Sequence, residues 1–280
     1  MNEFIIRGTR GTIPTCGKEF QGYGGDTTCY SLKTDSGIIV FDAGTGLAHL
    51  ASEIARMKEI PPITLFFTHF HMDHVIGLPC FEPLYDRSTR INILADPRRP
   101  DKWKKTLTTF MGKPYWPVGL GDTDAAMKLN DIPVNRDSMH VYGIRISWFR
   151  VPHPQQCLSF RIETADQVIV IATDVEYDHD NINPAFINFC RCADYLIYDA
   201  QYTPAEYLAH KGWGHSTWKT AAKIAACAGV ESLILTHHAP SRTDSEIEAI
   251  LKEARCSFAR TDFARTNMKL KKKRKATTTL

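Results

Sequence analysis

Short apolar runs recur along the chain, and glycine, proline or acidic residues separate them. Runs of about four to eight residues that are rich in Ile, Val, Phe and Tyr are typical of buried β-strands. The turn sequence Asp35-Ser36-Gly37 lies between two such runs and predicts a hairpin. We predict strands over residues 4–6, 28–34, 38–41, 63–67, 91–95, 144–151, 158–162, 168–172, 195–198 and 232–236.

Apolar residues at helical spacing mark the remaining elements. Leu47, Leu50 and Ile54 share one face of a segment that ends before Pro61. Thr243 and Glu246 have the spacing of a capping box, which begins a helix. We predict helices over residues 47–57, 102–110, 217–227 and 243–254, and an ordered loop or lid over 112–124. Strands open each half of the chain and helices close it. This order favours two mostly antiparallel sheets covered by helices over a strict strand–helix alternation.

Composition is that of an ordinary globular protein. The chain has 280 residues, of which 43% are hydrophobic and 23% are charged. No apolar run approaches the roughly 20 residues that a membrane-spanning helix needs. The first residues lack the basic start and apolar core of a signal peptide. We therefore expect a cytoplasmic protein without a membrane span.

Positive charge is concentrated at the C-terminal end. Residues 265–280 carry seven Lys and Arg and no acid, so subtracting seven from the net charge of +3 leaves −4 for residues 1–264. We expect residues 261–280 to form a disordered basic tail. Such a tail is often only solvated, but it could contact RNA or an anionic membrane surface. The acidic body is not the broad cationic surface that large nucleic acids need.

The most informative segment is Thr68-His-Phe-His-Met-Asp-His-Val75, which directly follows the predicted strand 63–67. His69 and His71 are two residues apart on extended backbone and therefore point the same way. Asp73 and His74 follow a turn and can face a neighbouring position. Imidazole and carboxylate groups are ligands for Zn, Mn and Fe. The segment predicts two adjacent metal ions, whereas the alternative is a polar loop that happens to be rich in histidine.

Further ligand types follow later strands. His153, Asp174 and His237 each come just after a predicted strand, and strand ends on one side of a sheet converge. We expect His69, His71 and His153 to hold one ion, and Asp73, His74 and His237 to hold the second. Asp174 would bridge them, because a carboxylate has two oxygens. His238 is the alternative to His237.

These residues resemble the metallo-β-lactamase superfamily. The resemblance rests on Thr68–His74, on Asp174 in Ala-Thr-Asp, on Thr236-His237 and on Asp42-Ala43-Gly44-Thr45-Gly46, and it covers roughly residues 3–255. It implies an α/β (α+β) protein with an αββα four-layer sandwich and a dinuclear metal site at its edge. Residues 1–260 would form this hydrolase domain.

The segment Gly212-Trp-Gly-His215-Ser-Thr217 is similar to the RNase Z and phosphodiesterase branch. This similarity implies a catalytic role for His215, partnered by Asp199 where RNase Z usually has Glu. Otherwise His215 is a structural residue at a helix N-terminus. Gly8 to Pro14 and Tyr23 to Thr27 look like the opening of metal-dependent phosphohydrolases. Between Asp174 and His215 there is no basic insertion like the tRNA-gripping arm of RNase Z, which favours a small substrate.

These observations together predict a dinuclear phosphodiesterase. We expect two divalent ions, Zn first and Mn or Fe as alternatives. A hydroxide between them would attack a cyclic nucleotide, a cyclic ribose phosphate or a similar small phosphodiester. Asp73, His215 and Asp199 are the predicted catalytic residues. The alternatives are an RNase Z-like endoribonuclease that holds RNA with its tail, a lactone, ester or thioester hydrolase, and a metal scaffold without hydrolytic turnover. We also expect a homodimer.

Overall fold

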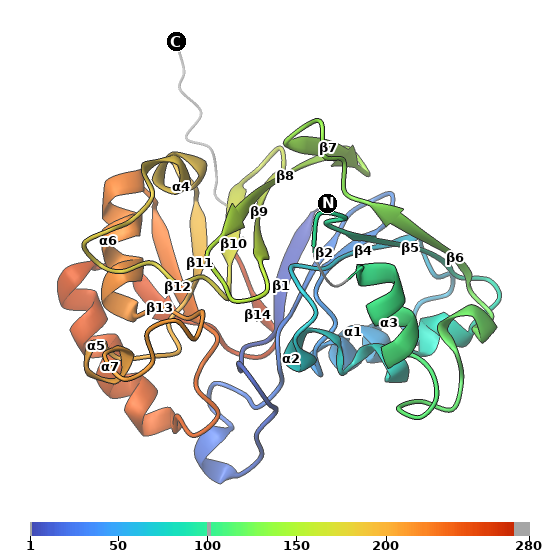
Figure 1. Ribbon diagram of the computed structural model, residues 1–280, viewed down its shortest axis with the longest axis horizontal. Helices are drawn as coiled ribbons and strands as arrows, with labels where there is room; N and C mark the ends of the chain where they lie inside the picture. Colours follow the sequence, from blue (N-terminus) through green and yellow to red (C-terminus); the bar gives the residue numbers. More distant parts are fainter. Residues whose placement is uncertain (1, 100–101, 272–280) are drawn as a thin grey trace.

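Two seven-stranded sheets face each other at the centre of the computed structural model, which describes residues 2–99 and 102–271. Helices cover the outer side of each sheet (Figure 1). This arrangement is the predicted αββα four-layer sandwich, and that prediction is confirmed.

The first sheet has the strand order β14-β1-β2-β3-β4-β5-β6. Its strands are β1 (Glu3–Gly8), β2 (Cys29–Lys33), β3 (Ile38–Phe41), β4 (Ile63–Phe66), β5 (Arg90–Ala95), β6 (Ala126–Asp131) and β14 (Met268–Lys269). The second sheet has the order β13-β12-β11-β10-β9-β8-β7. Its strands are β7 (Ser138–Val141), β8 (Ile144–Val151), β9 (Cys157–Glu163), β10 (Val168–Ala172), β11 (Tyr195–Asp199), β12 (Ser232–Thr236) and β13 (Thr261–Phe263).

Each sheet is half antiparallel and half parallel, so the prediction of mostly antiparallel sheets is wrong. Strands β14 to β3 pair antiparallel, and β3 to β6 pair parallel. The second sheet repeats this, with β7 to β10 antiparallel and β10 to β13 parallel. Parallel neighbours need a crossover, which helices such as α1 and α6 supply. Strands β6 and β13 were not predicted from the sequence, so two of the parallel pairings could not be expected.

The helices are α1 (Leu47–Ile54), α2 (Met72–Val75), α3 (Trp103–Phe110), α4 (Pro184–Phe189), α5 (Pro204–Tyr207), α6 (Trp218–Ala228) and α7 (Asp244–Ser257). The predicted capping box at Thr243 is formed, and Glu246 bonds back to its backbone. Helix α6 ends at Gly229, whose left-handed backbone suits glycine. Local sequence therefore fixes the start of α7 and the end of α6.

Three apolar layers hold the sandwich together. Between the sheets, the rings of Phe41, Phe66 and Phe160 have centroids 5.1–5.5 Å apart. A second cluster packs α1 and α3 against the first sheet, and a third packs α4, α6 and α7 against the second. Because both faces of each sheet are buried, the central strands are nearly continuous apolar runs.

Part of the predicted tail belongs to the two sheets. Within residues 261–271, β13 pairs with β12, and β14 pairs with β1. The expectation of disorder from residue 261 is therefore wrong up to residue 271, because Phe263 and Leu270 are buried in the core. The basic run at 272–275 lies outside the described residues. Among the helices that the structure describes, none is long and apolar enough to cross a membrane.

Candidate metal centre

The predicted ligands meet at one edge of the sandwich, where strands of both sheets end. His69 lies three residues beyond β4 in the first sheet, and Asp174 and His237 follow β10 and β12 in the second. Strand β8 runs in the same direction as β10, because both are antiparallel to β9, so His153 reaches the same edge. A single site thus draws on both sheets.

The side chains form two sets that share one carboxylate. In the first set, His69, His71, His153 and Asp174 each offer a ligand atom within 4.8 Å of the others. In the second set, Asp73, His74, Asp174 and His237 do the same. Asp174 Oδ1 lies 3.7 Å from His69 Nε2, whereas Oδ2 lies 3.0 Å from His74 Nε2 and 3.2 Å from His237 Nε2. One oxygen of Asp174 therefore faces each set.

Buried polar atoms without hydrogen-bond partners point into these sets. His69 Nε2, His74 Nε2 and Asp174 Oδ2 are buried and have no hydrogen-bond partner of suitable geometry within the described protein, although His74 Nε2 and Asp174 Oδ2 lie 3.0 Å apart. An unpartnered buried polar atom costs roughly 1–3 kcal/mol, and a cation that takes up these lone pairs removes that cost. The donor set is imidazole and carboxylate, which suits Zn, Mn and Fe. The residues present therefore fit a dinuclear metal site.

The pKa directions agree with two cation positions. Burial lowers the pKa of His69 well below its ordinary value, and burial with His153 lowers the pKa of His71 to about 4, so both rings offer free lone pairs. Burial alone would lower the pKa of His237, but Asp174 and Asp73 outweigh it and raise that pKa to about 9. Similarly, Asp174, Asp73 and Asp42 raise the pKa of His74 against the effect of burial. Without metal, the second set gathers positive charge as protons, which a divalent cation can replace.

Residues behind the metal ligands orient the histidine rings, a role that was not predicted for them from the sequence. Asp42 Oδ2 lies 2.9 Å from His74 Nδ1 and accepts a hydrogen bond from the Thr68 hydroxyl at 2.8 Å. Gln201 Oε1 lies 3.0 Å from His237 Nδ1, and the carbonyl of Gly214 lies 2.9 Å from His153 Nδ1. Such contacts fix which nitrogen is left for the metal. The role of Asp42 could have been predicted from the sequence, because Asp42 directly follows an apolar strand, as the predicted ligands do.

Backbone strain is concentrated at this edge. Thr12, Asp42, Asp174 and His237 all have φ between 55° and 67°, a left-handed conformation that is costly for residues other than glycine. Strain of this kind persists where surrounding contacts fix a side chain for function. The left-handed backbone at His237 also explains why this residue, and not the adjacent His238, points into the ligand cluster. His237 joins the cluster, while His238 Nε2 lies 3.0 Å from the carbonyl of Ala264, away from it.

His215 and Asp199 lie next to the second set. His215 Nδ1 is 2.9 Å from Asp199 Oδ2, so the shorter Asp still reaches the histidine. Asp199 also accepts hydrogen bonds from the backbone N–H groups of Asp174, Gln201 and Ser216. With Nδ1 held in this way, Nε2 on the opposite side of the ring is left for the cavity. His215, Asp199, Asp174 and His237 again bring ligand-type atoms within 4.8 Å of one another.

A cavity of about 330 Å³ opens over the cluster. His71, Asp73, Asp174, His215 and His237 form its floor and walls, and Trp213, which is 62% exposed, lies at its margin. Thr12, Gln201 and Tyr202 also line it and were not singled out from the sequence. Four of the predicted ligands, His71, Asp73, Asp174 and His237, therefore face the same space as His215, and this space can hold a small molecule.

Comparison with known proteins places the chain in a family. Residues 38–238 match the model of the beta-lactamase superfamily domain, and this range contains both ligand sets. The chain belongs to the metallo-β-lactamase superfamily. Family membership and the buried His/Asp clusters together make the protein a metal-dependent hydrolase.

The chain is similar in sequence to ribonucleases, and similar in fold to further proteins of known structure. The chain is 25% identical to ribonuclease BN of Enterobacter sp. strain 638, over 96% of this chain and 99% of the relative. It superposes on a diphosphatase of the PhnP family with a TM-score of 0.72 and 17% identity, covering 98% of both chains. Yeast PDE1 gives a TM-score of 0.65 and 16% identity over 95% of this chain and 96% of that one. The structural likenesses bear on the fold alone.

Proposed function

We propose that the protein is a dinuclear metal-dependent phosphodiesterase that hydrolyses a small or cyclic phosphodiester, such as a cyclic nucleotide or a cyclic ribose phosphate. The observation that carries this proposal is the buried His215–Asp199 pair, which lies beside two metal-ligand sets and presents His215 to the cavity above them. The name of the relative from Enterobacter, ribonuclease BN, supports phosphodiester chemistry.

Seven side chains would hold the metals. His69, His71 and His153 would bind one ion, Asp73, His74 and His237 the other, and Asp174 both. Zn suits the nitrogen-rich first set, and Mn or Fe would accept the same ligands. When bound, two such ions supply an activated water and offset the charge of the phosphoryl oxygens.

The chain's own groups have two further tasks. Asp73 Oδ2 accepts a hydrogen bond from the Thr12 N–H and lies on the side of His237 Nε2, so Oδ1 would be left to accept a hydrogen bond from the attacking water. His215, as imidazolium, donates from Nε2 to a phosphoryl oxygen or to the leaving alkoxide. Asp199 fixes the orientation of the ring through its contact with Nδ1.

The size of the cavity supports a small substrate. About 330 Å³ is at the lower end of the range for small-molecule sites. Residues 175–214, all described, form β11 with the short helices α4 and α5, and no protruding insertion interrupts them. An arm that could grip a large RNA is therefore missing from this segment.

A second candidate is an RNase Z-like endoribonuclease, which the name of the Enterobacter relative favours. It would cleave a precursor tRNA. Its affinity for that RNA would fall steeply as the salt concentration rises, and would also fall when residues 272–280 are removed. The preferred substrate in a panel of bis(p-nitrophenyl) phosphate, cyclic nucleotides, precursor tRNA and a lactone separates these functions from ester or lactone hydrolysis.

The deciding experiment removes His215. The purified enzyme, loaded with Zn or Mn, is assayed on the phosphodiesters of this panel beside His215→Ala and the matched control His140→Ala, whose ring is exposed on β7. We expect His215→Ala to lower kcat by about 10²–10⁴-fold, the usual contribution of a general acid. Elemental analysis should still find both metals in this variant, because His215 lies outside the two sets.

His69→Ala provides the complementary result, since loss of a ligand should lower the metal content itself. Full phosphodiesterase activity in His215→Ala would contradict the assignment to this branch. A metal-loaded wild-type enzyme that hydrolyses only the lactone would contradict the proposed reaction.

A further inference from the structure

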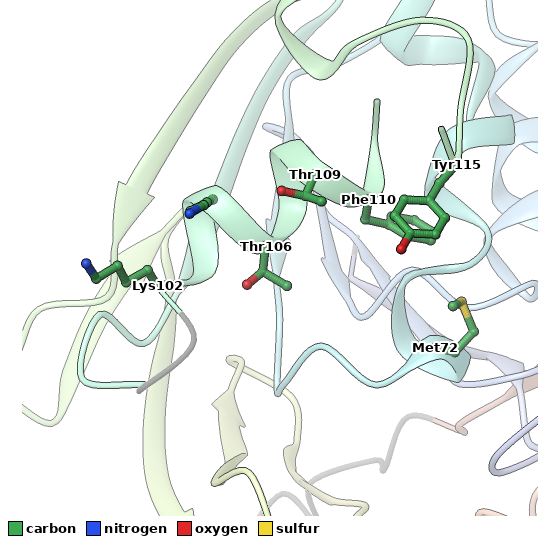
Figure 2. A pocket seen from close by; sticks show the side chains of 7 residues that line it. Met72, Lys102, Thr106, Thr109, Phe110 and Tyr115 are labelled. Atoms are coloured by element: carbon green, nitrogen blue, oxygen red, sulfur yellow. The ribbon is translucent and has the colours of Figure 1, made fainter. Parts of the chain in front are cut away.

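A second and larger cavity lies next to the candidate metal centre. It has a volume of about 640 Å³ (Figure 2). Its lining includes Lys102, which directly precedes α3, Lys105 and Phe110 on α3, and Tyr115 in the loop that follows the helix. Met72 lines both this cavity and the one over the metal ligands. Because Met72 stands between His71 and Asp73 in the chain, the second cavity begins directly beside the reacting centre.

One end of this cavity is aromatic. Figure 2 shows Phe110, Tyr115 and Met72 gathered toward the same end, with Lys102 toward the other. Tyr115 is 68% exposed and Met72 is 52% exposed, although large apolar side chains are usually covered. An exposed apolar surface inside a groove marks a place where a ligand packs. Flat aromatic rings are suited to stacking on a base.

The other end is cationic, and among the described residues no acid compensates its charge. Lys105 and Thr109 are four residues apart and share the face of α3 that lines the cavity. No carboxylate of a described residue pairs with Lys102 or Lys105, and none lines the cavity. Lys104 provides a contrast, since it points elsewhere and pairs with Asp131 at 3.0 Å. The ammonium groups of Lys102 and Lys105, which no carboxylate between residues 2–99 or 102–271 contacts, therefore favour an anionic group at this end.

We infer that this cavity binds a nucleotide arm of the substrate, with a base on Phe110 and Tyr115 and a second phosphate near Lys102 and Lys105. This inference rests on the proposed function and narrows its substrate class. The hydrolysed phosphodiester lies over the metal ligands, and the arm extends past Met72 along α3. The preferred substrate is then a phosphodiester that carries a further phosphate.

The test compares two substrates that differ only in that phosphate. The dinucleotide ApA and its 5′-phosphorylated form pApA are assayed with metal-loaded wild type, Lys105→Ala, Tyr115→Ala and the control Lys104→Ala. We expect Lys105→Ala to raise KM for pApA about five- to tenfold with little change in kcat, because it removes binding shared by ground and transition states. KM for ApA should stay within about twofold in this variant.

The aromatic end gives a separate readout. Tyr115→Ala should raise KM for ApA and pApA by a similar factor of about five, because both carry the base. Lys104→Ala should match wild type on both substrates. Fluorescence anisotropy of labelled pApA on metal-loaded His215→Ala measures binding without turnover, and adding Lys105→Ala to that variant should weaken Kd by the same factor as KM.

Failure of this inference differs from failure of the proposed function. Equal KM values for ApA and pApA in wild type, or a preference for pApA that survives in Lys105→Ala, would overturn the inference while hydrolysis itself continues. If wild type hydrolyses no phosphodiester, the proposed function fails.

Discussion

Two glycines show how closely single residues control the ring positions at the site. A Cβ at Gly214 would lie 2.2 Å from His153 Nδ1, and one at Gly11 would lie 2.2 Å from His237 Nδ1. Real Cβ atoms do not approach a ring so closely, so a side chain at either position must move a predicted ligand. The backbone passes within hydrogen-bonding distance of His153 only because residue 214 has no side chain.

We therefore predict that Gly214→Ala lowers the metal content. The added methyl displaces the His153 ring, and elemental analysis of the purified variant should show loss of at least one ion. Gly212→Ala is the matched control. Gly212 has a similar φ of +87° against +93°, but a Cβ there meets nothing within 4 Å. Equal metal content in the two variants would show that His153 does not depend on this contact.

Among the elements, the last described strand has an unexpected structural role. β14 extends the first sheet by pairing with β1, and Leu270, which follows it, is only 6% exposed and belongs to the core between the sheets. The amide of Leu270 also donates to the carbonyl of Phe4. Without β14, β1 would become an open edge that invites association.

We predict that a chain shortened after Asn267 is less stable than one shortened after Lys271. Loss of the buried Leu270 side chain and of the pairing to β1 should cost about 2–4 kcal/mol of unfolding free energy. Urea unfolding measures this cost, and light scattering detects the association that an open edge promotes. A midpoint shared by both shortened chains would mean that β14 contributes nothing to the fold.

At the scale of the whole molecule, Asp96 links the two sheets. It follows β5 in the first sheet and accepts a hydrogen bond from Arg150 Nε of β8 in the second at 2.8 Å, and another from Arg98 Nε at 2.9 Å. Burial alone would raise the pKa of Asp96, but these arginines outweigh it and lower that pKa. The carboxylate therefore stabilises the folded state only while it is ionised.

We predict that Asp96→Asn lowers the unfolding free energy at pH 7 by about 1–3 kcal/mol. Because the folded pKa lies below the ordinary value of 3.8, the stabilisation is fully present above that pH and is lost as the pH falls through the folded pKa. Urea unfolding from pH 7 to 3 should show the gap to wild type closing at the acid end. Asp124→Asn, which breaks an exposed pair with Arg87, should cost under about 1 kcal/mol at any pH. A gap for Asp96→Asn that is constant with pH would exclude the ionic explanation.

The sequence by itself determined the ligand types and the strands that present them. Each predicted ligand follows an apolar strand: the run from His69 to His74, and the later residues His153, Asp174 and His237. A strand followed by a ligand-type residue is a local pattern, which can be recognised in the sequence without knowledge of the fold. The central strands and the capped helix α7 were predictable for the same reason. The central strands and helix α7 depend on residues that are close together in the sequence, so the sequence alone was enough to predict them.

Only the tertiary structure decided which groups meet. It turned His237 rather than His238 inward, placed one oxygen of Asp174 toward each ligand set, and brought Asp42 and Gln201 behind the rings. It also drew β13 and β14 into the sheets and joined the cavity of α3 to the metal centre through Met72. These contacts join residues far apart in the chain, and strand pairing and backbone turns set their directions. No periodicity along a single segment records them.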